Sequence, residues 1–210
     1  MRTRLLQRTQ PKQQRAKNTV ELILKTATEL IEEVGFEAFT TKLLAQRANI
    51  LIRNIYRYYP NKLAIIYALA ERISAKQAEF IDNFSSVANP GIPWRDAVGS
   101  TINAFMSAAL AEPAFLTIRD AMHGSPELKA IDERSADEMT RRLTAAMKSR
   151  IPDFQDEKLQ LISMIILDTS VAIIDHALME YHAARNEQKL SETIEELKKI
   201  LTSYLAQYFE

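Results

Sequence analysis

Residues 40–60 read TTKLLAQRANILIRNIYRYYP, and this stretch decides the fold. Thr40 is a favourable N-cap for a short helix, because its hydroxyl can accept a hydrogen bond from a backbone N–H in the first turn. The apolar stripe of this helix consists of Leu44, Ala45 and Ala48. Asn49 follows, and asparagine is the non-glycine residue that most readily adopts a positive φ. A second short helix is expected from about Leu51 to Tyr58, so the stretch is typical of a helix-turn-helix.

Longer helices are expected on both sides of this motif. Before it, apolar residues recur at helical spacing from Thr19 to Val34. Asn18 and Glu21 fit a capping box at the start of that helix. Gly35 stands where a left-handed residue would end it. After the motif, a long helix is expected from Lys62 to about Phe84.

The rest of the chain also predicts helices, and no segment shows the alternation of a strand. Turn-forming residues at 85–93, 124–126 and 152–153 separate them. These helices are expected at 94–111, 113–123, 127–150, 156–185 and 190–209. With only 4 glycines and 7 prolines, the composition favours long helices over a turn-rich β fold. We predict an all-α protein of about nine helices.

Charge is distributed unevenly along a chain whose formal net charge is zero. Residues 1–62 carry 12 Lys and Arg against 5 Asp and Glu, whereas residues 63–210 carry 15 against 22. This asymmetry predicts a polyanion-binding N-terminus, although a solvated basic arm without a partner would have the same charge.

The composition also bounds the cellular context. The absence of cysteine excludes disulfides and thiolate metal sites, and it suits the reducing cytoplasm, where we expect the protein to act. The first residues lack the apolar segment of a secretory signal. No membrane span is expected either, because the longest uncharged stretch, 97–111, is too short to cross a bilayer.

The motif and its surroundings resemble the TetR family of transcriptional regulators. Residues 35–50, GFEAFTTKLLAQRANI, resemble the family's GF…TT…IA…AGV stretch, and residues 55–62, IYRYYPNK, resemble its LYRYFPSK segment. The resemblance covers residues 19–70. Two positions depart from it: Leu51 stands where the family has a small polar N-cap, and Arg53 stands where it has glycine.

The resemblance implies a domain order and a function. A basic arm would occupy residues 1–17, and a three-helix DNA-binding domain with the helix-turn-helix would occupy 18–63. A larger helical domain for ligand binding and dimerisation would follow at 64–210. The implied function is a repressor that binds a palindromic operator in double-stranded DNA as a homodimer and is released by a small-molecule inducer. No cofactor or metal is implied.

The residue types of the second short helix suit base reading in the major groove of DNA. Arg53, Asn54 and Arg57 lie on one side of this helix, and arginine pairs well with guanine while asparagine pairs with adenine. The predicted DNA contacts are Thr41, Lys42, Arg53, Asn54, Tyr56, Arg57 and Lys62, of which Lys42 is implied by the resemblance to be a second reader. The arm residues that could follow the DNA backbone are Arg2, Arg4, Arg8, Lys12, Arg15 and Lys17. Ile55 and Tyr59 are expected in the core.

Two features of the last helices predict a dimer. Residues 190–208 carry a heptad-like seam, and residues 161–174 are apolar nearly all round their helix. A seam that packs only within one chain is the alternative. The predicted interface residues are Ile166, Ile173, Leu190, Ile194, Leu197, Leu201 and Tyr204.

Candidate ligand contacts fall on the helices between. They are Trp94, Phe105, Met106, Phe115, Arg119, Met122, His123, Met139, Asp168 and Asp175. Methionine-rich surfaces adapt to apolar ligands, although plain core packing is the alternative. Arg119 and His123 would serve as polar anchors. Asp168 and Asp175 share one face of the most apolar helix and would pair either with a basic side chain or with a cationic ligand.

Two other functions compete with a ligand-gated repressor. An enzyme is disfavoured, because the chain has only 3 histidines and lacks the GxGxxG, P-loop and HExxH motifs. Asp120 and His123 could supply two metal ligands, which is too few to define a site. The remaining alternative is a helical DNA-binding regulator without a small-molecule effector.

Overall fold

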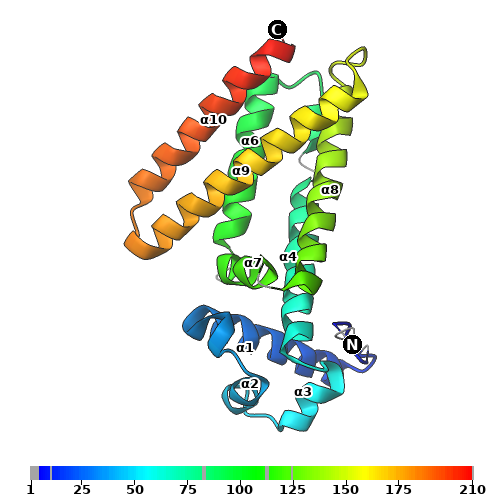
Figure 1. Ribbon diagram of the computed structural model, residues 1–210, viewed down its shortest axis with the longest axis vertical. Coiled ribbons are helices and arrows are strands. Elements are labelled where there is room, and N and C mark those ends of the chain that lie inside the picture. The colour runs from blue at the N-terminus through cyan, green and yellow to red at the C-terminus, as the bar shows by residue number, and fades with distance from the viewer. Residues whose placement is uncertain (1–4, 10, 82–83, 112–113, 124, 210) are drawn as a thin grey trace. The chain divides into compact units, whose positions relative to one another are not determined.

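The computed structural model describes residues 5–9, 11–81, 84–111, 114–123 and 125–209, except for the side chains of residues 74, 76–81, 123, 127 and 131. These residues form ten helices and no strand (Figure 1). In chain order they are α1 (Gln14–Ala38), α2 (Thr41–Arg47), α3 (Ile52–Tyr58), α4 (Lys62–Ile81), α5 (Phe84–Ala88), α6 (Trp94–Leu110), α7 (Phe115–His123), α8 (Pro126–Lys148), α9 (Asp156–Ala184) and α10 (Glu187–Phe209). The all-α prediction is confirmed, with one helix more than expected.

The chain divides into two compact units. The first contains residues 1–75 and 112–133, and the second contains residues 76–111 and 134–210. Helices α4 and α8 therefore contribute residues to both units. Helix α7 belongs to the first unit because it packs against α1.

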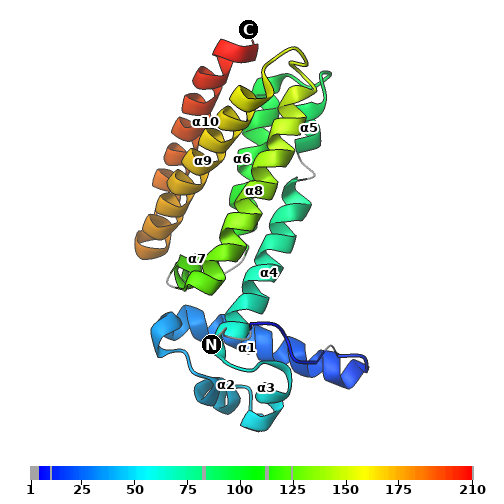
Figure 2. The same ribbon diagram turned by 45° about the vertical axis from the view of Figure 1, so that its right-hand side comes forward.

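In the first unit, α1 packs against α2 and α7, and α2 packs against α3 (Figures 1 and 2). The apolar residues that recur at helical spacing on α1 form a single buried face, which consists of Val20, Ile23, Leu24, Ala27, Leu30 and Ile31. Phe39, Leu44 and Ile55 are fully buried as well. The core that holds the helix-turn-helix in place is thus predicted correctly by the apolar pattern.

The start of α1 differs from the prediction, whereas its C-terminal end agrees with it. The helix begins at Gln14, and its N-cap, Gln13, makes no side-chain capping bond. Asn18 lies inside the helix and accepts a hydrogen bond of 2.8 Å from Gln14. The predicted capping box is therefore wrong, because the good helix formers before Asn18 extend the helix by a turn. Gly35 has the predicted positive φ, 74°, and kinks the helix before its last residues.

In the second unit, α9 and α10 form an antiparallel pair, and α6 packs against both (Figures 1 and 2). Arg185, in the left-handed conformation with φ 52°, ends α9. The side chain of Asn186 then accepts a hydrogen bond of 2.9 Å from the backbone N–H of Lys189 at the start of α10. Lys189 Nζ also donates to Glu180 across the pair at 2.8 Å. The tight turn fixes the pairing of the two helices.

Helix α5 lies in a segment that the sequence pattern predicts to be a loop. A helix of five residues is marginal on its own, so tertiary contacts must hold it. Phe84 and Val87 are buried. The guanidinium of Arg150, from the connection between α8 and α9, donates hydrogen bonds to the carbonyls of Ser86 (3.0 Å), Val87, Asn89 (2.6 Å) and Ile92 (2.8 Å). Arg150 thereby anchors the C-terminal end of α5 and the turn after it.

Helix α9 is, by length and composition alone, long and apolar enough to cross a membrane. This differs from the expectation based on uncharged stretches, because Asp168 and Asp175 interrupt an otherwise apolar run. Only 39% of its most apolar 18-residue window is buried inside the structure. A helix of this composition that packs on one side leaves apolar side chains on the surface of the second unit.

Candidate DNA-binding surface and ligand cavity

The turn between α2 and α3 has the geometry that its residues predict. Thr40 caps α2, where its Oγ1 accepts a hydrogen bond of 3.1 Å from the backbone N–H of Leu43. Asn49 has φ 52°, and the N–H of Ile50 returns to the carbonyl of Ala45 at 3.0 Å. Leu51 precedes α3 without a side-chain capping bond. Backbone hydrogen bonds and buried side chains, rather than a polar cap, therefore set the position of α3.

The two sides of α3 differ sharply in exposure. Ile55 and Tyr59 are almost completely buried, as predicted, and burial raises the pKa of the Tyr59 hydroxyl to about 12. Arg53 and Arg57 are exposed, and Asn54 is half-buried. Lys42 on α2 is exposed as well. An uncharged buried side fixes the helix to its core, and the opposite side presents cationic and amide groups to solvent.

Thr41 and Tyr56 join the two short helices at their surface. The Thr41 hydroxyl and the Tyr56 hydroxyl lie 3.0 Å apart and share a hydrogen bond. Tyr56 is exposed and Thr41 is half-buried. Both hydroxyls keep further hydrogen-bonding capacity, so this pair can hold α2 and α3 together and still face a phosphate.

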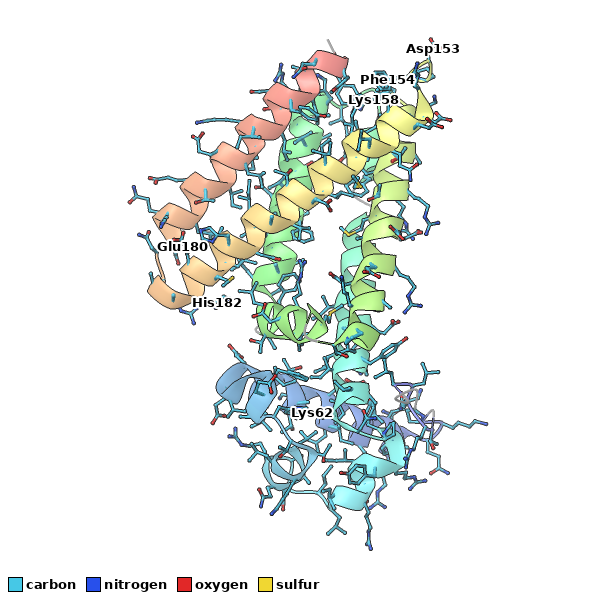
Figure 3. All side chains as sticks on the ribbon, viewed as in Figure 1. Lys62, Asp153, Phe154, Lys158, Glu180 and His182 are labelled. Atoms are coloured by element: carbon cyan, nitrogen blue, oxygen red, sulfur yellow. The ribbon has the colours of Figure 1, made fainter. Side chains whose placement is uncertain are left out.

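Lys62 makes contacts that the sequence does not predict. Its Nζ donates to the carbonyl of Phe36 at 3.3 Å and lies 4.3 Å from the centre of the Phe36 ring (Figure 3). The side chain is half-buried. These contacts connect the first turn of α4 to the end of α1, so in this structure the ammonium group is directed to the protein.

The N-terminal arm lies against the end of α3. The backbone N–H of Arg8 donates to the carbonyl of Tyr58 at 2.7 Å, and its guanidinium donates to the carbonyl of Tyr56 at 3.2 Å. These carbonyls belong to the last turn of a helix and lack partners within it. Of the other arm residues predicted to follow DNA, Lys12, Arg15 and Lys17 are exposed, while Arg2 and Arg4 lie outside the described residues.

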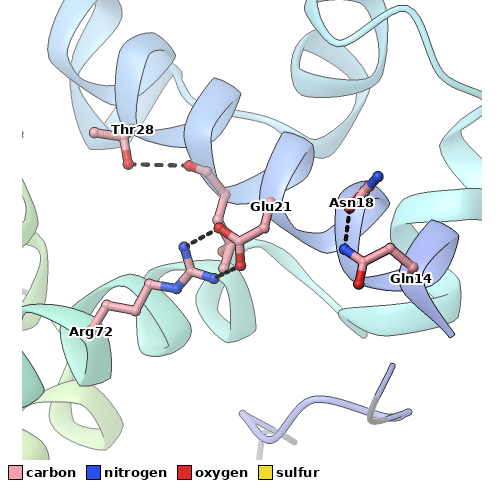
Figure 4. A network of polar contacts seen from close by, with 6 residues as sticks. Gln14, Asn18, Glu21, Thr28 and Arg72 are labelled. Atoms are coloured by element: carbon pink, nitrogen blue, oxygen red, sulfur yellow. Dashed lines mark hydrogen bonds and ion pairs between the residues drawn. The ribbon is translucent and has the colours of Figure 1, made fainter. Parts of the chain in front are cut away.

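Ion pairs across the first unit hold its helices together. The Arg72 guanidinium on α4 forms a two-pronged hydrogen-bonded pair with the Glu21 carboxylate on α1, including one contact of 2.9 Å (Figure 4). The hydrogen bond from Arg72 lowers the pKa of Glu21 below its ordinary value. Arg47 on α2 pairs with Glu33 on α1 at 2.8 Å. No local pattern predicts either pair, because the partners are 51 and 14 residues apart.

The second unit contains an apolar cavity between α5, α6, α8, α9 and α10. The volume of the cavity that is accessible to the centre of a water molecule is about 80 Å³. Among the predicted ligand contacts, Trp94, Phe105 and Met139 line it. Sequence reasoning missed the walls formed by α5 and α10, which include Phe84, Val87, Leu205 and Phe209.

None of the other predicted ligand contacts is among the described residues that line this cavity. Met106 is buried on α6 but does not line it. Phe115, Arg119 and Met122 belong to α7 in the first unit, where Phe115 and Met122 are core residues. The Arg119 guanidinium lies 5.6 Å from the centre of the Phe115 ring. The side chain of His123 lies outside the described residues.

The two aspartates of α9 also lie outside the cavity wall. Asp168 is exposed and Asp175 is half-buried. Helical spacing places them on one side of α9, as predicted, but the apolar side of the helix that faces the cavity contains Ile166, Ser170 and Ile174 instead.

Most of the predicted interface residues pack inside one protomer. Ile166, Ile194, Leu197 and Leu201 are buried within the second unit, and both Ile166 and Leu201 line the cavity. These three residues of the α10 seam therefore pack within the chain, as the alternative given above expects for the whole seam. Ile173, Leu190 and Tyr204 are half-buried.

A different apolar surface lies on α9. Leu161, Met164, Ile165 and Met179 are exposed, with 56% of Met179 accessible, and Ile200 on α10 is exposed as well. Leu161, Ile165 and Met179 are separated by multiples of about one helical turn, so they follow one side of α9. The exposed Asp168 lies on the same side, seven residues after Leu161. Exposed apolar side chains gathered in this way are a common feature of interaction surfaces.

Comparison with known proteins covers both units of the chain. A family model described as "Bacterial regulatory proteins, tetR family" matches residues 23–69, and one described as "Tetracyclin repressor-like, C-terminal domain" matches residues 93–205. The tetracycline repressor protein class C of Escherichia coli is 32% identical over 91 residues, which are 43% of this chain and 39% of that protein. An uncharacterized HTH-type transcriptional regulator of Bacillus subtilis, YdeS, is 30% identical over 130 residues, which are 61% of this chain and 58% of that protein.

The similarity of the fold to a known structure also extends over most of the chain. A crystal structure of a TetR-family transcriptional regulator from Streptomyces coelicolor superposes with a TM-score of 0.63 at 25% identity, covering 90% of this chain and 98% of the other. The matches to the two curated relatives span only 39% and 58% of their lengths.

Proposed function

The chain belongs to the TetR family of bacterial transcription regulators, a family of DNA-binding proteins rather than enzymes, and on this premise we propose that it is a cytoplasmic repressor. It binds a palindromic operator as a homodimer, and a small molecule releases it. The observation that carries this proposal is the two-sided character of α3, which is buried through Ile55 and Tyr59 and exposes Arg53 and Arg57.

The exposed side of α3 supports reading of base edges. Arg53 and Arg57 are four residues apart and extend from the same side of the helix, which suits guanine contacts in the major groove. Asn54 adds a group that pairs with adenine. Arg53 supplies bulk and charge where the family has glycine, so we propose that it makes a contact that distinguishes this operator from those of relatives.

Other groups of the first unit would hold the protein in register on the DNA. We assign Lys42, Thr41 and Tyr56 to backbone phosphates, since hydroxyl and ammonium groups contribute position rather than sequence reading. Lys62 has a different role in this proposal. Its contacts with Phe36 support the angle between α1 and α4, and it reaches phosphate only if those contacts open.

The exposed stripe of α9 supports the dimer. We propose that Leu161, Ile165 and Met179 pack against a second copy, together with Ile200 of α10. A twofold axis places two recognition helices about 34–36 Å apart, which is one turn of B-DNA and matches a palindrome. The half-buried Ile173, Leu190 and Tyr204 would border this interface, while the buried seam residues support it from within.

The cavity supports a small-molecule effector. It lies in the second unit, and α4 contributes residues to that unit as well as to the first. We propose that a ligand in the cavity favours an arrangement of the protein that does not fit the operator. A coupling of about 1–3 kcal/mol between the two sites is typical of such regulators.

Selection of DNA by the purified protein tests the proposal. Duplexes with a random central segment are incubated with the full chain, and bound molecules are separated, amplified and sequenced. We expect a palindrome whose half-site centres lie about 10–10.5 base pairs, or a multiple of this, apart. Sedimentation of the complex should show two protomers per duplex. Recovery of no common sequence, or of a single half-site bound by one protomer, would contradict it.

A further inference from the structure

We propose that the cavity of the second unit takes an uncharged, apolar ligand, such as an aliphatic chain with a neutral end, and excludes ligands that carry a charge. This inference rests on the proposed function for its regulatory meaning, but the binding itself does not depend on DNA. The evidence lies in the chemistry of the cavity wall and in the hydrogen bonds of its few polar atoms.

The wall of the cavity contains no charged side chain and no amide, among the residues that the structure describes there. Aliphatic and aromatic side chains from five helices form nearly all of it, with Phe105 and Trp94 from α6 and Leu143 from α8 among them. A carboxylate or ammonium group inside this wall would lose its water and would meet no side chain of opposite charge, which is costly. The cavity therefore disfavours charged ligands, because no opposite charge on its wall compensates for the lost hydration.

The two hydroxyls on the wall are already used. Thr101 Oγ1 donates to the carbonyl of Ala97 at 2.8 Å, and Ser170 Oγ donates to the carbonyl of Ile166 at 2.6 Å. Both bonds return to the same helix four residues back, which is a common arrangement for buried hydroxyls. Each hydroxyl can still accept a hydrogen bond, but neither has a proton left for a carboxylate.

The size of the cavity suits an apolar group better than water. A single water requires about 10–15 Å³ on the same measure, and it also requires two or more polar partners. The 80 Å³ here are several times larger, and the wall offers few such partners. An apolar ligand would fill this space with dispersion contacts and would displace no well-held water.

The single tryptophan of the chain makes the inference measurable. Trp94 lines the cavity and packs on Phe209, with their ring centres 5.4 Å apart. A ligand between α6 and α10 must change the surroundings of the indole. Trp94 emission therefore reports occupancy in the free protein, without any operator.

The test uses three probes with the same eight-carbon chain: 1-octanol, octanoate and octylammonium. At about pH 8 the acid is ionised and the amine is protonated, so the probes differ in charge. We expect 1-octanol to change Trp94 emission saturably and to raise the melting temperature. The two charged probes should require about 100-fold higher concentration or more. Equal binding of either charged probe, or no binding of 1-octanol up to its solubility, would overturn the inference.

Three variants locate the binding. Val98→Phe fills the cavity and should abolish the response to 1-octanol, whereas Asn103→Phe adds the same ring on the exposed side of α6 and should leave it unchanged. Thr101→Val keeps the volume and removes one hydroxyl, so it should bind 1-octanol as well as the parent chain. A response of Val98→Phe equal to that of the parent, or a lost response in Thr101→Val, would overturn the assignment.

Operator release separates this inference from the proposed function. If 1-octanol binds, as judged by Trp94, and does not release selected operator DNA, the ligand class stands and the proposed response to small molecules fails. If octanoate or octylammonium releases the operator more effectively than 1-octanol does, the response stands and the ligand class is overturned.

Discussion

The two units of this protein expose different surfaces. In the first unit, most apolar side chains of α1, α2 and α3 form a core, although Leu22, Leu51 and Ile52 are exposed, and the outer side of α3 presents Arg53 and Arg57. In the second unit, α9 leaves Leu161, Ile165 and Met179 in solvent, and the interior retains a cavity. The first unit is suited to a polar polyanion, and the second has apolar surfaces that a second copy and an apolar ligand would cover.

This difference also separates two kinds of apolar residue on neighbouring helices, one buried and one exposed. Leu197 of α10 is buried inside one protomer, whereas Ile165 of α9 is 41% accessible. If the second unit is completed by a partner, the two positions should fail in different ways when they are changed. Substitutions at either position therefore test the proposed difference between packing within a chain and packing between chains.

The largest effect is expected for Ile165→Asp. An aspartate on the α9 stripe would be buried without a partner, and the twofold axis would bury it twice, at a cost of several kcal/mol. Sedimentation at micromolar concentration should show a folded monomer, and operator affinity should fall because one half-site alone binds weakly. Gln160→Asp adds the same charge at an exposed position of α9 and should stay dimeric. A dimeric Ile165→Asp would remove this stripe from the interface.

The next effect concerns the inside of the protomer. Leu197→Ala should lower the free energy of unfolding by about 2–5 kcal/mol, because it leaves a cavity in a packed region. The dimer should persist. Urea unfolding at a fixed protein concentration measures the change, since dimerisation makes stability depend on concentration. Leu22→Ala makes the same deletion at an exposed position of α1 and should cost much less. Equal losses in the two variants would show that Leu197 does not lie in a core.

A smaller effect is expected on the DNA-binding side. Arg57→Ala should weaken binding to the selected operator by about 1–3 kcal/mol if Arg57 contacts a base, and should reduce the salt dependence by about one phosphate contact if it contacts the backbone. Titration at several salt concentrations distinguishes the two. Arg47→Ala removes a basic side chain that pairs with Glu33, so it should change affinity less. Unchanged binding of Arg57→Ala at every salt concentration would exclude α3 as the reader.

The two units also differ in how far local sequence determines them. Thr40 and Asn49 specify a capped helix and a turn within ten residues, and regular apolar spacing specifies the buried face of α1, so the helix-turn-helix could be predicted. The cavity and the exposed stripe could not, because periodicity shows that α9 is apolar but not which of its sides meets α6 and α10. The seam on α10 was predicted, but spacing alone cannot tell packing within a chain from packing between chains.

Single long-range contacts are the other features that could not be predicted from the sequence. Arg150 determines α5 through carbonyls about 60 residues away, and Arg8 binds the end of α3 in the same way. A lone arginine in a connecting segment has no local signature. At Lys62 the local pattern predicts a phosphate contact, but the side chain is bound to the carbonyl of Phe36 instead.

The smallest effect tests whether the first unit depends on a surface ion pair. Glu21 and Arg72 keep 63% and 43% of their side chains accessible, so solvent screens the pair and Glu21→Gln should cost only about 0.2–1 kcal/mol.

The sign of the pH dependence of this effect follows from the lowered pKa of Glu21. The folded protein holds the ionised carboxylate more strongly than the unfolded chain does, so the contribution is complete above the ordinary pKa of 4.5 and disappears as the pH falls through the lower folded value. The stability gap between the parent chain and Glu21→Gln should therefore be constant near neutrality and close in acid. Urea titrations at several pH values measure it, and the double variant with Arg72→Gln gives the interaction energy as the non-additive part. A gap that stays open in acid would mean that Glu21 supports α1 by packing rather than by charge.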